Sequence, residues 1–133
     1  MDKGVMLSIH PEWLEMIFNA EKGLEFRKKI ISTIKPETKI YFYETKKKNG
    51  TGKVVGDAII TKVDMLDPTK HDLYLQCWSY IGYLNQRYMI CFTAVNKYDH
   101  PLELTDFEYN NGKILIHPPQ NMVNVRRKLK WKP

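Results

Sequence analysis

Cysteine is scarce in this chain, and long hydrophobic runs are missing. The 133 residues contain two cysteines, Cys77 and Cys91, both in largely apolar stretches of the sequence. We therefore expect two reduced cysteines in a core rather than a disulfide, and no cysteine–histidine spacing predicts a metal site. No apolar run approaches the roughly 20 residues of a membrane span, and no basic segment followed by an apolar one predicts a secretory signal. These features predict a cytoplasmic protein with no membrane partner, metal or cofactor.

Acidic residues are fewer than basic ones, and this imbalance indicates what kind of partner the protein could bind. The chain has 21 Lys and Arg against 15 Asp and Glu, a formal net charge of +6. This sign favours polyanions such as RNA or other nucleic acid. One basic group, Lys46 to Lys48, precedes a glycine-rich turn and is predicted at a hairpin tip, where it could equally be a solvated loop. The other, residues 126–132, is predicted as a basic tail, in which Trp131 could stack on a base or simply fray.

The hydrophobic pattern predicts several strands, few helices and a single domain. At 133 residues with 43% apolar composition, the chain can bury one core. Because strands and helices do not alternate as βαβ units, we predict the α+β class and a mixed β-barrel. Within this pattern, Gly56 predicts a bulge or a close approach by another backbone. Strands are expected at residues 5–9, 24–27, 39–44, 54–63, 87–96 and 113–117, helices at 11–20 and 71–83, and a helical turn at 103–107.

The first thirty residues hold the most informative pattern. Pro11 suits the first turn of a helix, where its missing N–H is not needed. Glu25 and Arg27 lie two apart in an alternating segment, so they share one face of a strand, and Lys22 lies in the turn before them. From spacing alone, Lys22 is most simply a solvated lysine, and the Glu25–Arg27 pair is an ion pair that contributes little if exposed.

This segment resembles the ASCH domain, a branch of the PUA-like superfamily. Lys22, Glu25 and Arg27 match the family's Gly-x-Lys-x-x-Glu-x-Arg pattern, with Ala20 in place of its glycine. The resemblance implies a mixed β-barrel of the PUA-like/ASCH type, with two or more helices and a cleft beside Lys22. It covers nearly the whole chain, through residues 7–11, 39–44, 54–60, 94–101 and 118–120.

The resemblance also implies roles for the residues of the cleft. Arg27 would meet a phosphate or carboxylate through its planar fork, and Glu25 would orient Arg27 or Lys22, or accept from a base amino group. Ser8 and His10 could reach the same cleft, although a histidine before a proline is more often a structural cap. No catalytic residue is assigned, with Lys22 and Glu25 as candidates. The candidate binding residues are Ser8, His10, Lys22, Glu25, Arg27, Lys46, Lys47, Lys48, Gln120, Arg126 and Arg127.

Three functions fit these residues. The first is RNA binding, with phosphate contacts by Lys and Arg and a single-stranded base in the cleft. The second is a small hydrolase acting on a modified nucleoside or nucleic acid, because the acetylcytidine amidohydrolases of the same superfamily look similar. Their threonine falls on Glu25, which cannot be the same hydroxyl nucleophile, and their glutamate has only Asp67 or Asp72 as counterparts. The third is a sensor of a nucleotide-like small ligand, or a domain that binds a protein partner.

Overall fold

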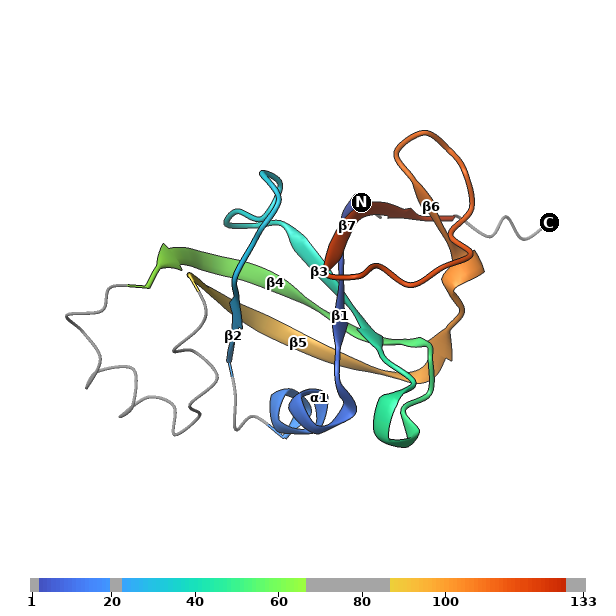
Figure 1. Ribbon diagram of the computed structural model, residues 1–133, viewed down its shortest axis with the longest axis horizontal. Helices are drawn as coiled ribbons and strands as arrows, with labels where there is room; N and C mark the ends of the chain where they lie inside the picture. Colours follow the sequence, from blue (N-terminus) through green and yellow to red (C-terminus); the bar gives the residue numbers. More distant parts are fainter. Residues whose placement is uncertain (1–2, 20–22, 67–86, 129–133) are drawn as a thin grey trace.

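The computed structural model describes residues 3–19, 23–66 and 87–128 (Figure 1). In these residues, seven strands form one mixed sheet in the order β2-β5-β4-β3-β1-β7-β6, with the single α-helix α1 (Pro11–Phe18). Two 3-10 turns, η1 (Lys47–Asn49) and η4 (Leu104–Asp106), lie between strands. The strands are β1 (Lys3–Ile9), β2 (Leu24–Arg27), β3 (Lys39–Glu44), β4 (Val54–Met65), β5 (Tyr88–Leu102), β6 (Phe107–Tyr109) and β7 (Met122–Arg127).

Strand β1 brings the two ends of the described chain together. It pairs in parallel with β3, with Val5 opposite Ile40, and antiparallel with β7, with Val5 opposite Asn124. A parallel pair needs a long crossover connection, and here the connection includes α1 and β2. Because β7 runs against β1, the residues that precede β7 lie at the carboxyl end of β1, where the backbone N–H of Ser8 donates to the carbonyl of Asn121 at 3.1 Å.

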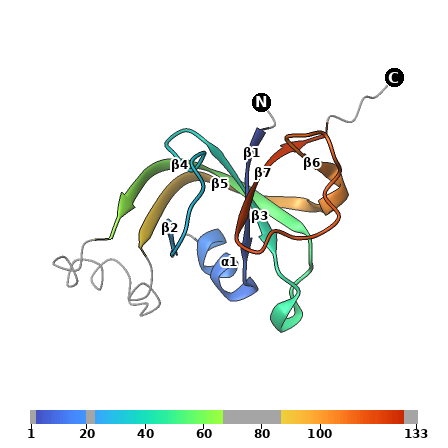
Figure 2. The same cartoon turned by 45° about the horizontal axis from the view of Figure 1, so that its top comes forward.

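The sheet is curved (Figure 2). A hydrophobic cluster is buried on each of its faces. Leu14 and Ile17 of α1 are 1% and 2% exposed, and they pack against one face. Burial of each such side chain stabilises the fold by about 1.5–3 kcal/mol. Alternation along β3 sends Phe42 into this cluster and Tyr41 into the opposite one. The second cluster comprises Met6, Tyr41, Tyr43, Val54, Phe107, Leu115 and Val125.

Gly56 lies where two elements approach β4 closely, as its position in a strand predicts. The register between β4 and β5 shifts between Val54 and Gly56. A Cβ on Gly56 would lie 2.4 Å from the carbonyl oxygen of Asn96 and 2.8 Å from Cζ of Phe18. A glycine is therefore required by contact with both the neighbouring strand and the helix.

The described strands form an open sheet, which differs from the predicted closed barrel. Strands β2 and β6 are its edges, and the strand order includes no pairing between them. The expected helix at residues 71–83 lies outside the described residues, as does Cys77, whereas Cys91 lies half-buried in β5 and burial raises the pKa of its thiol. None of the helices in the described ranges is long and apolar enough to cross a membrane.

Two local predictions are wrong, both near the C-terminus. Residues 113–117 form no strand, because only an isolated bridge joins Ile114 to Glu108. Residues 122–127 form β7, although 126 and 127 were predicted to begin a basic tail. The two arginines obscured the strand pattern before them, in which Val123 and Val125, two residues apart, pack against one hydrophobic cluster. The strands at 24–27 and 39–44 are confirmed at their expected bounds.

Candidate functional site

A cleft opens where the carboxyl end of β1 faces β2 and the segment before β7. It consists of two adjoining pockets of about 390 and 640 Å³ that share Ser8, His10 and Arg27. Both volumes lie within the range of about 300–1,000 Å³ that is typical of small-molecule sites. The first, here named the Trp13 pocket, is also lined by Trp13, Glu25, Lys28, Lys29 and Asn121. The second, the Ile116 pocket, is also lined by Tyr43, Thr45, Lys46, Lys47, Leu104, Ile116, Pro118 and Gln120.

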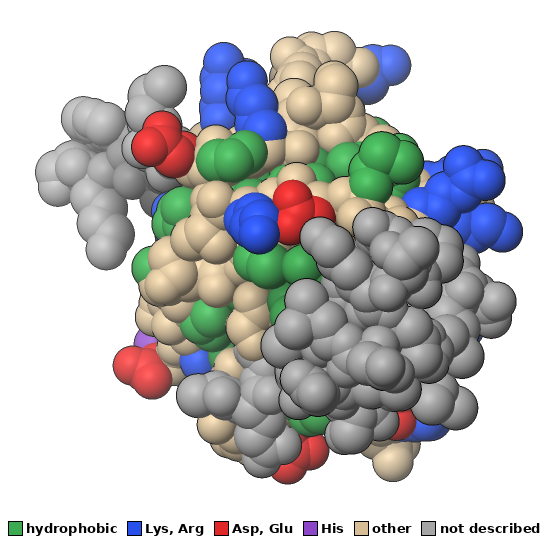
Figure 3. Space-filling model, turned by 90° about the vertical axis from the view of Figure 1, so that its left-hand side faces the viewer, with side chains coloured by type: hydrophobic (Ala, Val, Ile, Leu, Met, Phe, Trp, Pro, Cys, Tyr) green, Lys and Arg blue, Asp and Glu red, His purple; other side chains and the backbone are tan. Residues whose placement is uncertain are grey.

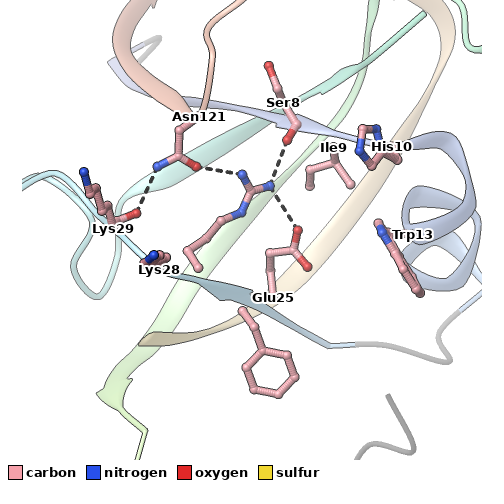
Figure 4. Close-up of a pocket in the computed structure, with 10 residues that line it drawn as sticks. Ser8, Ile9, His10, Trp13, Glu25, Lys28, Lys29 and Asn121 are labelled. Atoms are coloured by element: carbon pink, nitrogen blue, oxygen red, sulfur yellow. Dashed lines mark hydrogen bonds and ion pairs between the residues drawn. The ribbon is translucent and has the colours of Figure 1, made fainter. Parts of the chain in front are cut away.

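The Arg27 guanidinium joins three segments of the chain in the floor of the cleft (Figure 4). Its Nη2 donates to the carbonyl oxygen of Ser8 at 2.8 Å and to Oε2 of Glu25 at 3.0 Å. Its Nη1 donates to Oδ1 of Asn121 at 2.7 Å, and Nδ2 of Asn121 donates to the carbonyl of Lys29 at 3.0 Å. Arg27 is thereby held in one orientation, as a planar group with several fixed acceptors should be.

Strand β2 presents this ion pair on one face because its side chains alternate. Glu25 and Arg27 point into the cleft, while Phe26 between them packs with Met16 and Met89. The Arg27 and Glu25 side chains are 15% and 9% exposed. Within the described ranges, Glu25 is the one charged residue classed as buried. The shared face predicted from the sequence is confirmed, and the pair is far less exposed than a surface ion pair.

Ser8 and His10 lie on the wall between the two pockets. The Ser8 hydroxyl donates to the carbonyl of Pro119, and Nδ1 of His10 lies 3.0 Å from Oγ1 of Thr45. His10 occupies the N-cap position of α1, but its side chain makes no capping bond. The expectation of a structural cap is therefore wrong for the side chain. The Ser8 hydroxyl is bound to a backbone carbonyl rather than to a basic side chain, so it lacks the arrangement of an activated nucleophile.

Positive charge dominates the lining of the cleft. Among the described residues, five Lys and Arg line the two pockets, namely Arg27, Lys28, Lys29, Lys46 and Lys47, against one carboxylate, Glu25. That carboxylate is paired with Arg27. The net positive charge of the cleft therefore comes from the lysines on its two sides. On the face shown in Figure 3, Lys and Arg side chains gather toward the upper and right-hand margins.

Three of the predicted binding residues line neither pocket. Lys48 is held by Glu12, with Nζ 2.8 Å from Oε2. Arg126 pairs with Glu108 on the neighbouring strand β6, and Arg127 is exposed at the end of β7. The cleft does contain Ser8, His10, Glu25, Arg27, Lys46, Lys47 and Gln120, whereas Lys22 and Trp131 lie outside the described residues.

Sequence reasoning missed several residues of the cleft. Lys28 and Lys29 directly follow the strand that carries Glu25 and Arg27, and this adjacency in the sequence could have identified them as residues of the cleft. The helical spacing of Trp13 predicts a core residue, yet Trp13 is half-buried and lines the first pocket. No pattern in the sequence around Asn121 indicates that it belongs to the cleft. In the part of the chain that the structure describes, no group of three or more His, Cys, Asp or Glu side chains is placed to hold a metal ion.

Comparison with known proteins supports the fold. No family model and no curated protein matches the chain. An ASCH protein from Zymomonas mobilis has a similar solved structure, with a TM-score of 0.66, 20% identity, and coverage of 92% of this chain and 87% of that one. A tyrosine-to-phenylalanine mutant of it has a TM-score of 0.65 and 19% identity, with coverage of 90% of this chain and 88% of that one. A serine-to-alanine mutant has a TM-score of 0.58 and 22% identity, with coverage of 92% of this chain and 87% of that one. The chain therefore has an ASCH-type fold, as its sequence resemblance indicated.

Proposed function

We propose that this protein is an ASCH-type module that binds single-stranded nucleic acid, RNA in particular, in the cleft described above. The observation that carries the proposal is the charge of the cleft: five Lys and Arg against one carboxylate that is already paired. Lysines on both sides would contact successive phosphates and release their counterions. A single-stranded base would enter between them, because unstacked bases are what proteins read in RNA.

The ion pair in the floor supports a positioning role for Glu25. Of the roles considered for this residue, orienting Arg27 agrees with the 3.0 Å contact between Nη2 and Oε2. Arg27 is fixed by Ser8, Glu25 and Asn121 before any ligand arrives. A preorganised guanidinium loses little freedom on binding a phosphate, which favours affinity. Lys22, which lies outside the described residues, remains a proposed ligand contact.

The extent of the positive lining favours a nucleic acid over an isolated nucleoside. Lys28 and Lys29 line the Trp13 pocket, whereas Lys46 and Lys47 line the Ile116 pocket. A nucleoside that occupied one pocket would leave the lysines of the other without a role. A chain of phosphates would use both groups.

The proposal is tested by fluorescence anisotropy with a labelled single-stranded RNA at two salt concentrations. The variant Lys28→Ala/Lys47→Ala removes one cation from each pocket. Lys35→Ala/Lys113→Ala is the matched control, because it removes the same charge from two exposed lysines that line neither pocket. We expect the first variant to lose about tenfold in affinity, since each phosphate contact adds to a sequence-independent electrostatic term. The control should remain within about twofold, because exposed lysines that line neither pocket make no contact in the cleft and are screened by salt.

A second comparison separates the fixed arginine from the exposed lysines. Arg27→Ala should cost more affinity than Lys47→Ala, because a confined, charge-assisted contact is stronger than one that water and salt screen. Binding is measured well below the melting temperature of each variant. Absence of RNA binding at low salt, or equal losses for the two variants, would contradict the proposal. Thermal stabilisation by mononucleosides without RNA binding would instead support a small-ligand sensor.

A further inference from the structure

The two pockets of the cleft share two chemical features, although different elements build them. Each combines an apolar surface on which a base can lie with a pair of lysines that can hold a phosphate. We propose that the cleft is a two-nucleotide site: one nucleotide occupies each pocket, and the phosphodiester that links them lies against Arg27. This inference rests on the proposed function. It adds how many nucleotides the cleft holds and where each of them lies.

The Trp13 pocket supplies an aromatic surface beside two cations. Trp13 projects from α1 on one side of the pocket, and Lys28 and Lys29 lie toward the other side (Figure 4). The indole is half-buried, so part of it is accessible. Stacking on an aromatic side chain suits any base, because every base has a π face.

The Ile116 pocket supplies an aliphatic surface beside two other cations. Ile116 is 68% exposed, and it lines the pocket together with Leu104 and Pro118. An isoleucine this exposed at the mouth of a pocket can bury apolar area when a flat ligand covers it. Lys46 and Lys47 line the same pocket from the hairpin between β3 and β4.

Arg27 belongs to both pockets and has hydrogen-bonding capacity left. A guanidinium has five N–H donors. Three are used, two at Nη2 for Ser8 and Glu25 and one at Nη1 for Asn121. Within the described ranges, no acceptor is found for the Nε–H or for the second Nη1–H. These two donors lie on different edges of the guanidinium, so each can donate one hydrogen bond to a phosphate oxygen at the boundary of the two pockets, where the charge of Arg27 also attracts the phosphodiester.

Isothermal titration calorimetry of the full chain with 5′-phosphorylated uridine mono-, di- and trinucleotides tests the assignment. We expect the second nucleotide to raise affinity about tenfold, within the range that one stacked base provides. The third nucleotide should add about twofold or less, because it has no pocket and contributes only a screened charge. Equal gains for the second and third nucleotides would overturn the two-nucleotide site while leaving RNA binding intact. If a longer single-stranded RNA also fails to bind, the proposed function itself is wrong.

A dinucleotide with a neutral methylphosphonate linkage tests the position of Arg27. It should lose most of the tenfold gain, and affinity equal to that of the natural dinucleotide would overturn the contact. Ile116→Ser should weaken the dinucleotide about fivefold and leave the mononucleotide unchanged, since one apolar surface is lost. Ile114→Ser is the matched control, because Ile114 is an exposed isoleucine of the same segment that lines neither pocket. Equal losses for the two variants would overturn the assignment of the second pocket.

Discussion

Two arginine–glutamate pairs lie in different parts of the sheet and differ in their surroundings. In the floor of the cleft, Arg27 pairs with Glu25, and the side chains are 15% and 9% exposed. At the outer edge, Arg126 of β7 pairs with Glu108 of β6, and the exposures are 45% and 18%. The first arginine also donates to two further segments of the chain, whereas the second donates through both Nε and Nη2 to one oxygen of Glu108.

The two pairs have the same residue types, so we expect their different burial to set how much each contributes to stability. An exposed ion pair contributes about 0–1 kcal/mol, because water and salt screen it and two long side chains must be ordered. A buried pair is different: removing one partner costs about 3–5 kcal/mol, since the other charge remains away from water. The sequence suggested nucleic-acid contacts for both arginines, but only Arg27 lies in a pocket.

The largest expected effect comes from deleting each arginine in turn. Arg27→Ala should lower the free energy of unfolding by about 3 kcal/mol, near the low end for a buried pair because both side chains keep some exposure. Arg126→Ala should lower it by less than about 1 kcal/mol. Urea unfolding followed by circular dichroism measures both values. Similar losses for the two variants would mean that the pairs are energetically equivalent despite their different burial.

Two glycines provide the next test, one beside the cleft and one beside the edge. A Cβ on Gly50 would lie 1.7 Å from the carbonyl oxygen of Thr45, so Gly50→Ala must displace the hairpin that carries Lys46 and Lys47. We expect a loss of about 1–3 kcal/mol, as for other overpacked sites, together with weaker RNA binding. Gly112 has open space but a φ of +85°. Gly112→Ala should cost about 1 kcal/mol without affecting binding. Unchanged RNA affinity of Gly50→Ala would argue against a role for the hairpin.

The salt dependence of RNA binding gives a smaller and more specific difference. Removing one phosphate contact lowers the slope of log K against log salt concentration by about 1. Lys28→Ala should show this change, whereas Arg126→Ala should keep the slope of the unmodified protein. Anisotropy titrations over a salt series measure the slopes. A reduced slope for Arg126→Ala would extend the binding surface to the edge of the sheet.

The smallest effect concerns Tyr98, which packs against the second hydrophobic cluster, the one that contains Tyr41 and Phe107. Its hydroxyl donates to Oδ2 of Asp57 at 2.6 Å, and burial, followed by this contact, raises its pKa above the ordinary value of 10.0. Below that value both the folded and unfolded states hold the proton. Above it the unfolded state ionises first, so the contribution of Tyr98 to stability is lost as pH rises.

The measurement is denaturant unfolding at about pH 9 and about pH 11, on either side of the ordinary tyrosine pKa. The unmodified protein should lose up to about 1 kcal/mol more stability over this interval than Tyr98→Phe. Tyr43, whose pKa is also raised by burial, is present in both proteins and cancels in the difference. Equal losses would show that Tyr98 ionises as easily in the folded state as in the unfolded state.

The floor of the cleft was partly predictable because part of it is local. The common face of Glu25 and Arg27 follows from the two-residue period of one strand, and the structure confirms it. Asn121 was not predictable, because its role depends on an arginine 94 positions away. Arg126 was misjudged because the sequence pattern shows its charge but not the partner strand that supplies Glu108.

The contacts that close the cleft have a consequence for the order in which the protein is synthesised. Ser8 meets the carbonyl of Pro119 across 111 positions, and Arg27 meets Asn121 across 94. Contacts this distant require a long loop to close, and the entropy of closure must be lost before the contacts contribute. A chain still emerging from the ribosome, N-terminal part first, holds the lysines and the arginine but not the asparagine that fixes them. The assembled floor, and any ligand recognition that depends on it, can therefore appear only after nearly the entire described chain has been translated.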